Sequence, residues 1–273
     1  MTGNTRSATS LSPEVRATLP KESESPWIAS CRFPSFPRLR TPPAVDVVVV
    51  GAGITGLTCA ALLKQAGKRV AVVDASRVAE GVTGGTSAHL TEVPDCTYRK
   101  LLAHFGEKDG RRAAAASRAA IDTIASFVHT RRIECGFHRV PGYYYTERAE
   151  QVEEVRQELE AARALGVEPV PTRDVPLPFQ VEAALRFDGQ ARFHVREYLL
   201  PLLESIPGDG SFVFENTRVT EVHDGAPCVV ETETGEITAA DVVMATHVPL
   251  NRLLLQTKVA HYRIDTTTLG QDN

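Results

Sequence analysis

The residues best placed to do chemistry are three glycines that follow a run of four valines. Gly51, Gly53 and Gly56 form the pattern G-x-G-x-x-G directly after Val47–Val50, and apolar residues at helical spacing come next. In such a turn the first glycine permits a tight bend, the second lets the backbone approach a pyrophosphate, and the third lets helix and strand pack closely. The N–H groups at the start of the helix then attract the anion. The pattern predicts a dinucleotide site.

An acidic residue stands where such a site needs one. Asp74 lies 23 residues after Gly51, close to the spacing of about 20 at which a carboxylate meets the adenosine ribose. We expect Asp74 to accept hydrogen bonds from the ribose hydroxyls and to repel the 2′-phosphate of NADP. Arg77 is interpreted as a surface charge. A glycine-rich turn without a ligand is the alternative interpretation, and these residues leave NAD and FAD equally open.

The elements that position these residues form a βαβ unit of about thirty residues. The β-branched run from Val45 to Val50 is typical of a parallel strand that is buried on both faces. The helix after the glycines is expected to end at Gly67 in the left-handed conformation, and residues 69–74 are predicted to form the second strand.

Apolar spacing predicts the elements further along the chain. We expect helices over 113–128, 148–165 and 196–206, the second of them closed by Gly166. Strands are expected over 137–146 and 184–193, with a turn or bulge at Pro141-Gly142. Four short strand patterns, at 212–214, 217–223, 229–234 and 236–238, indicate an antiparallel meander. The apolar run 241–245 is suited to a central parallel strand.

Composition narrows the class of protein. The 273 residues are 42% apolar and carry a formal net charge of -4, so we expect no nucleic-acid partner. No run approaches the roughly 18 apolar residues that a membrane span requires. Five widely spaced cysteines favour reduced thiols, and the N-terminus lacks the apolar run of a secretory signal. We therefore expect a cytoplasmic protein, and the sequence carries no signal for an oligomeric state.

The loop after Asp74 decides between the two dinucleotides. Residues 75–89 are small and rich in hydroxyls, and they resemble the FAD-dependent oxidoreductases of the D-amino acid oxidase and glycine oxidase superfamily. In that family this loop runs past the pyrophosphate and under the flavin. The resemblance extends from residue 45 to about 263 and includes Phe193-His194, Asn216–Val219 and Val243–Thr246. It implies that the cofactor is FAD.

Other segments resemble a bacterial subgroup of the superfamily whose members often carry a C-terminal Rieske [2Fe–2S] domain. They are Ser25–Trp27, Phe33–Pro37, Thr86–Thr91 and Ala245–His247. A Rieske cluster needs Cys-x-His and Cys-x-x-His pairs, and the sequence has only Cys135-Gly136-Phe137-His138. We interpret that pair as a buried thiol and a surface histidine, and expect neither a cluster nor another metal site.

The resemblance implies a set of cofactor contacts. The pyrophosphate would be held by Gly51, Gly53, Ile54, Thr55 and Gly56, the ribose by Asp74, and the pyrophosphate and ribityl region by Thr86, Ser87 and Ala88. Val219 would contact adenine through its backbone, with a plain core valine as the alternative, and Ala75 and Thr246 complete the set. Most relatives have Glu at the position of Asp74, so the shorter side chain here keeps the role with looser geometry.

These observations imply an α/β fold: a Rossmann-type, glutathione-reductase-like FAD-binding domain with an inserted α+β substrate or cap domain. We assign residues 45–130 and 194–263 to the FAD domain and 131–193 to part of the cap. Residues 1–44 form a Pro- and Ser-rich arm whose later part either docks on the body or is an unpacked linker. Residues 264–273 form a polar tail without the family's late Gly-Asp segment, so we expect a C-terminally truncated chain with an incomplete flavin half-site.

The expected reaction is oxidation of an amine or amino acid C–N bond, with hydride transfer to flavin N5. The protein then mainly orients the substrate and excludes water, so no catalytic side chain is assigned. Tyr143 and Tyr145 share one face of a predicted strand, and this face either packs within the sheet or lines a substrate pocket. His89 is either a structural histidine or a contact of the flavin. The alternatives are a truncated, non-catalytic remnant with a dinucleotide half-site and a nicotinamide-dependent reductase.

Overall fold

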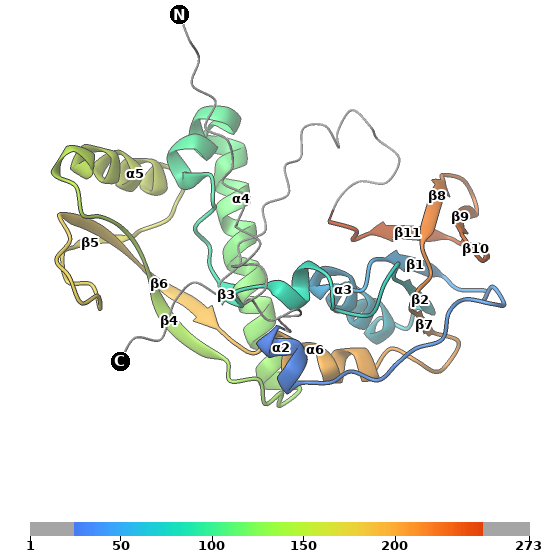
Figure 1. Ribbon diagram of the computed structural model, residues 1–273. Coiled ribbons are helices and arrows are strands. Elements are labelled where there is room, and N and C mark those ends of the chain that lie inside the picture. The colour runs from blue at the N-terminus through green and yellow to red at the C-terminus, as the bar shows by residue number, and fades with distance from the viewer. Residues whose placement is uncertain (1–24, 248–273) are drawn as a thin grey trace, which may run out of the picture.

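Four parallel strands form the sheet that carries the glycine motif. The computed structural model describes residues 25–247 and places this sheet on the right of Figure 1. Its strands are β1 (Val47–Val50), β2 (Val70–Val73), β7 (Phe212–Phe214) and β11 (Asp241–Met244), in the order β11-β1-β2-β7. The expectations for residues 1–24, 248–263 and 264–273 lie outside the described residues.

The run of four valines is explained by the layers on the two faces of this sheet. On one face, Val47 and Val49 pack in a core with α3 (Ile54–Gln65) and α6 (Val195–Glu204). On the other, Val48 and Val50 pack against an antiparallel sheet, whose strands are β8 (Val219–His223), β9 (Cys228–Thr232) and β10 (Gly235–Ala239). Every residue of β1 is therefore buried, as in other parallel strands covered on both faces.

A third sheet lies on the left of Figure 1, beside two helices. Its strands are β3 (His89–Leu90), β4 (His138–Thr146), β5 (Val170–Thr172) and β6 (Ala183–Arg192), all antiparallel. The helices are α4 (Thr97–Thr130) and α5 (Val152–Ala164), the latter after the 3₁₀ turn η2 (Ala149–Gln151). Tyr98 of α4 and Phe187 of β6 share one buried cluster with α5. No helix of residues 25–247 is both long and apolar enough to cross a membrane.

Local glycine signals are confirmed. Gly67 follows α3 with a φ of 80°, and Gly166 follows α5 with the same φ, so each supplies the left-handed conformation that ends a helix. The register of β4 against β6 shifts between Val140 and Gly142, where the sequence predicts a turn or bulge.

Three predicted elements need correction. β7 does not belong to the antiparallel meander, because it pairs in parallel with β2 and buries Val213 and Phe214 in the two opposite cores. β11 is parallel as predicted but lies at the edge of the sheet within the described residues, with Met244 46% exposed. The helix predicted over 113–128 starts earlier, just after Gly106, and a further helix precedes it from Thr97. The two helices that make up α4 meet at a kink, because Gly106 has a non-helical φ of 72° and ψ of 177°.

The later part of the arm docks on the body. After the short helix α2 (Pro26–Ser30), Phe33 and Leu39 are buried in the two cores of the parallel sheet. The carboxylate of Glu215, only 2% exposed, accepts hydrogen bonds from Phe36 N at 3.0 Å and from Val78 N at 2.9 Å. One buried side chain therefore ties the arm to the segment that follows β2.

Replacing Glu215 should destabilise the fold. Glu215→Ala leaves the buried N–H of Val78 and the partly buried N–H of Phe36 without a partner, so we expect the free energy of unfolding to fall by about 3 kcal/mol, with a smaller loss for Glu215→Gln. Urea unfolding followed by circular dichroism measures both. Exposed Glu204 is the control, because Glu204→Ala should change the stability by less than about 0.5 kcal/mol. Equal stability of all three variants would contradict the role of Glu215.

Candidate cofactor site

The glycine motif brings backbone segments closer together than side chains would allow. A Cβ on Gly56 would lie 1.8 Å from the carbonyl oxygen of Gly51, so α3 rests directly on the turn after β1. Gly51 has a φ of 103°, and a Cβ there would lie 2.4 Å from the carbonyl oxygen of Ala245, just after β11. Gly51 and Gly56 thus have the backbone tasks that the sequence predicts for them, a tight turn and close packing of helix on strand.

Asp74 holds both sides of the turn at the carboxyl ends of the strands. Its Oδ2 accepts a hydrogen bond from Ala52 N at 2.7 Å, and its Oδ1 accepts one from Ser76 N at 2.8 Å. Asp74 is partly exposed and each of its oxygens can accept a further hydrogen bond. The carboxylate can therefore order the glycine turn and still bind a ribose hydroxyl.

A threonine from the following loop reaches the start of α3. Thr83, in the 3₁₀ turn η1 (Val82–Gly85), accepts a hydrogen bond from Ile54 N at 3.0 Å through its Oγ1. A Cβ on Gly53 would lie 3.0 Å from this oxygen. Gly53 is the N-cap of α3 and provides no side-chain cap, so the remaining first-turn N–H groups can bind an anion.

These segments enclose a cavity of about 1050 Å³ at the carboxyl ends of β1, β2 and β11. Eight of the predicted cofactor residues line it: Gly51, Gly53, Ile54, Thr55, Asp74, Ala75, Val219 and Thr246. Gly56 lies beneath, in the contact of helix and strand. Val219 is also a buried core residue, and its contact with adenine stays a prediction.

Three predicted residues do not line this cavity. Thr86, Ser87 and Ala88 follow η1, and the Thr86 carbonyl accepts a hydrogen bond from the indole N–H of Trp27. Sequence reasoning also missed lining residues, namely Ser76, Ala79, Thr83, Thr217 and Arg218. The hydroxyls of Ser76 and Thr83 were signalled only by the hydroxyl-rich composition of the loop over residues 75–89.

The remaining sequence candidates lie elsewhere. His89 is exposed on β3, and Tyr144 packs on the cluster with α5, whereas Tyr145 is 40% exposed and its ring lies 6.2 Å from that of Phe179. Cys135 is buried and His138 exposed, as predicted. Burial raises the pKa of the Cys135 thiol.

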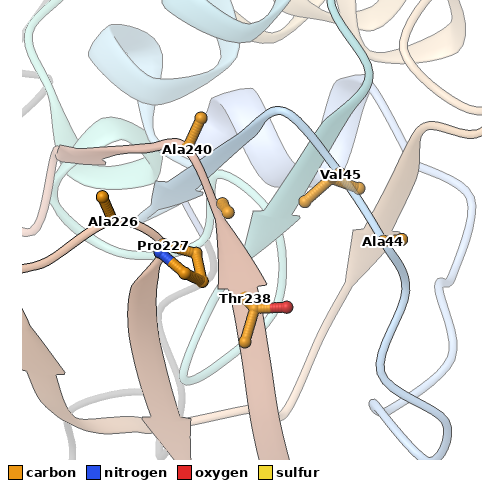
Figure 2. A pocket seen from close by; sticks show the side chains of 7 residues that line it. Ala44, Val45, Ala226, Pro227, Thr238 and Ala240 are labelled. Carbon is orange, nitrogen blue, oxygen red and sulfur yellow. The ribbon is translucent and has the colours of Figure 1, made fainter.

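A second cavity, of about 410 Å³, lies between the segment that precedes β1, the turn between β8 and β9, and the end of β10 (Figure 2). Thr238 offers the one hydroxyl among its lining side chains, and the others are Ala44, Val45, Ala226, Pro227, Ala239 and Ala240. Such a lining can bury apolar surface but supplies no ionisable group, so chemistry is not placed there.

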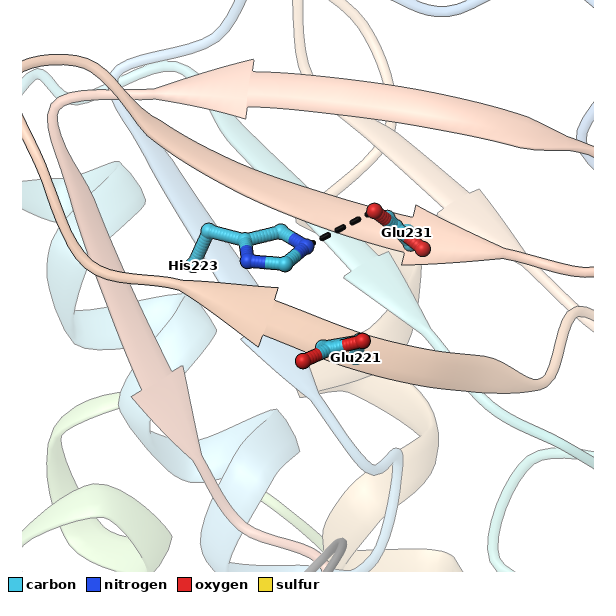
Figure 3. A group of neighbouring side chains, drawn as sticks. All are labelled: Glu221, His223 and Glu231. Atoms are coloured by element: carbon cyan, nitrogen blue, oxygen red, sulfur yellow. Dashed lines mark hydrogen bonds and ion pairs between the residues drawn. The ribbon is translucent and has the colours of Figure 1, made fainter.

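A charged cluster covers the outer face of the β8–β9 pair (Figure 3). Glu221 and Glu231 are directly opposite each other, and His223 Nε2 lies 2.7 Å from Glu231 Oε1. Two facing carboxylates repel, and a protonated imidazole between them offsets this. The hydrogen bond to Glu231, together with the nearby carboxylates, raises the pKa of His223.

The fold and the site define a dinucleotide-binding α/β protein of the flavoprotein type. A known family matches it: the profile of the DAO family, described as FAD dependent oxidoreductase, matches residues 46–270. The chain belongs to this DAO family of FAD-dependent oxidoreductases, and its cofactor is FAD.

Individual relatives and solved structures agree with this family. A Bacillus subtilis protein, YhfW, whose name describes a Rieske 2Fe-2S iron-sulfur protein, is 34% identical over 83% of this chain and 45% of its own length. Escherichia coli gamma-glutamylputrescine oxidoreductase is 25% identical over 78% of this chain and 51% of its own. Glycine oxidase from Geobacillus kaustophilus has the same fold, with a TM-score of 0.60, 18% identity and coverage of 74% and 55%. The chain spans about half the length of the curated relatives it matches.

Alanine substitutions at three glycines should separate fold from ligand binding. Gly56→Ala forces α3 away from β1 and should cost about 3 kcal/mol of stability. Gly53→Ala crowds Thr83 and should weaken ADP binding with a smaller loss of stability. Gly85, with no atom within 4 Å of an added Cβ, is the control and should change neither. Urea unfolding and calorimetric titration with ADP make the comparison, and a fully stable Gly56→Ala would contradict the close contact.

The titration of His223 should depend chiefly on Glu231. We expect its pKa to lie above the ordinary value of about 6.5, and Glu231→Gln to lower it more than Glu221→Gln does, because only Glu231 is hydrogen-bonded. The pair's contribution to stability is then full below that ordinary value and is lost as the pH rises through the folded-state pKa. NMR titration of the imidazole resonances measures the shift. Equal effects of the two variants would contradict the hydrogen bond.

Proposed function

We propose that this protein oxidises the C–N bond of an amine or amino acid, with FAD held at the cavity beside the glycine motif. The observation that carries the proposal is the convergence of Gly53, Asp74 and Thr83 on the start of α3, at the carboxyl ends of parallel strands. In open α/β sheets dinucleotides bind at this edge.

The residues present fit the ADP half of the cofactor. The first-turn N–H groups of α3 would bind the pyrophosphate, because Gly53 lets it approach the backbone without a side chain in the way. Asp74 would accept hydrogen bonds from the ribose through the lone pairs that Ala52 and Ser76 leave open. Val219 would meet the adenine from β8. We also propose Ala75 and Thr246 as contacts of the same cofactor.

When bound, FAD supplies the redox chemistry by accepting a hydride at flavin N5. The chain's own residues bind and orient the cofactor, and we infer that residues 131–193 belong to a cap domain that helps to exclude water. An amine or amino acid substrate is supported by the 25% identity to gamma-glutamylputrescine oxidoreductase. Thr86, Ser87 and Ala88 would act beyond the ADP half, toward the ribityl chain.

Ligand competition tests the cofactor, and anaerobic reduction tests the substrate. FAD should bind to the purified chain and be displaced by ADP but not by FMN, because the proposed site recognises the ADP half. Amines and amino acids are then screened, without oxygen, for loss of the oxidised-flavin absorbance. Tighter binding of NADH than of FAD would favour the nicotinamide-dependent reductase. FAD binding without reduction by any amine or amino acid would favour the non-catalytic remnant, and binding of neither cofactor would overturn the proposal.

Asp74→Asn should weaken ADP binding by about tenfold or more, because hydrogen bonds to a charged acceptor contribute about 1.5–3 kcal/mol. In the variant, the side-chain NH₂ would also face one of the two backbone N–H groups that donate to the carboxylate in the parent chain, and two donors cannot form a hydrogen bond. Asp241→Asn is the matched control, since Asp241 is exposed at the opposite end of its strand. Calorimetric titration gives both dissociation constants. Equal affinities would remove Asp74 from the site.

A further inference from the structure

The arm contacts the loop that closes one side of the cofactor cavity. We call residues 25–39 the N-terminal brace and residues 79–88 the cofactor loop. The indole Nε1 of Trp27 donates a hydrogen bond to the carbonyl oxygen of Thr86 at 2.7 Å. A Cβ on Gly84 would lie 3.1 Å from Cδ1 of Ile28, so this side chain packs directly on the backbone of η1. Both contacts come from α2, and Figure 1 shows α2 beside α6.

A buried arginine joins the same two segments. Arg196, 1% exposed at the start of α6, donates hydrogen bonds to the carbonyl oxygens of Cys31 at 2.8 Å and Ala79 at 3.3 Å. Its guanidinium lies 3.9 Å from the centre of the Phe33 ring. Because Cys31 and Phe33 belong to the brace and Ala79 to the cofactor loop, Arg196 connects them through the body of the protein.

A histidine fixes the position of α2 itself. His194 Nδ1 accepts a hydrogen bond from Glu197 N as the N-cap of α6, so Nε2 carries the proton of the neutral ring. That nitrogen lies 2.9 Å from Ser30 Oγ, the last residue of α2. The Trp27 ring packs edge-on against the His194 ring, with 4.9 Å between their centres. Trp27 is therefore held from one side and presents its N–H to the loop.

The cofactor loop needs such support, because its backbone is strained. Ala79 and Ala88 both have left-handed φ values, 54° and 56°, which cost an alanine of order 1 kcal/mol each. Apart from the 3₁₀ turn, the loop has no helix or strand of its own. Thr83, which meets the start of α3, lies between these two strained positions.

We propose that the N-terminal brace holds the cofactor loop in its binding conformation, with Trp27 as the positioning residue. The inference rests on the proposed cofactor site but adds a role for a segment outside the dinucleotide-binding unit. A strained loop that is held in advance pays less ordering free energy when a ligand binds. Loss of the brace should therefore loosen the loop first and weaken ligand binding as a consequence.

Hydrogen–deuterium exchange of the ligand-free chain tests the brace without any cofactor. Trp27→Phe keeps an aromatic ring beside His194 but removes the N–H donor, so exchange in residues 79–88 should rise by about three- to tenfold. Trp27→Ala and Ile28→Ala should raise it further, while exchange in β1 stays unchanged. The control is Arg38→Gln, in the same segment, which breaks only the exposed pair with Glu233 and should leave the loop as it is. Unchanged loop exchange in all variants, or an equal rise in β1, would overturn the proposal.

Affinity for ADP separates this inference from the proposed function. ADP should bind to Trp27→Ala at least about threefold more weakly than to the parent chain, because a smaller fraction of molecules has the loop in place. If the parent chain binds neither ADP nor FAD while the variants still loosen the loop, the role of the brace is supported and the proposed cofactor site is contradicted. If the parent chain binds ADP and both Trp27 variants bind it equally well with an unchanged loop, only the role of the brace is contradicted.

Discussion

The contact between α3 and the turn after β1 is the constraint on which the site depends. With the Gly51 carbonyl oxygen 1.8 Å from the place of a Cβ on Gly56, any side chain there would push the helix off the strand. Because the helix lies so close, its first turn faces the carboxyl ends of β1, β2 and β11. Asp74 then reaches Ala52 from the end of β2. The position of the cavity is therefore set by the close contact between the backbones of α3 and the turn after β1, and side chains such as Asp74 add hydrogen bonds to it.

The sequence was most informative where structure is decided locally. The βαβ unit, the ends of α3 and α5 and the bulge in β4 each rest on residues adjacent in the chain, such as Gly67 and Gly166. Pairing between distant segments was not readable in the same way. Three residues, Phe212–Phe214, are too few to show whether one face or both are buried, and only their pairing with β2 makes β7 a parallel strand. The start of α4 was missed because α4 consists of two helices that meet at the non-helical Gly106, which breaks the apolar period.

In the candidate site, too, residues within one continuous unit were predictable and contacts between distant segments were not. The glycines and Asp74 were found because their spacing is set by one continuous unit. The bond from Ala52 N to Asp74 and the reach of Thr83 to Ile54 N depend on how a loop folds back, which no spacing records. The docking of the arm was open between two interpretations for a related reason. Phe33 and Leu39 are apolar, but only the cores that receive them show that they are buried.

Two buried charged side chains explain how the loops around the cavity keep one conformation. Burying an unpaired charge costs several kcal/mol, yet Glu215 and Arg196 are both almost inaccessible to water. Both bond to backbone groups of segments that have no strand partner: Glu215 accepts from Phe36 N and Val78 N, and Arg196 donates to the carbonyls of Cys31 and Ala79. Glu215 also forms an ion pair with Arg77, whose Nε lies 3.7 Å from Glu215 Oε1. Each buried charge thus gains hydrogen-bond partners, and the backbone groups of the loop gain theirs. Loops held in this way are ordered before a ligand binds, and a site made of backbone N–H groups requires this order.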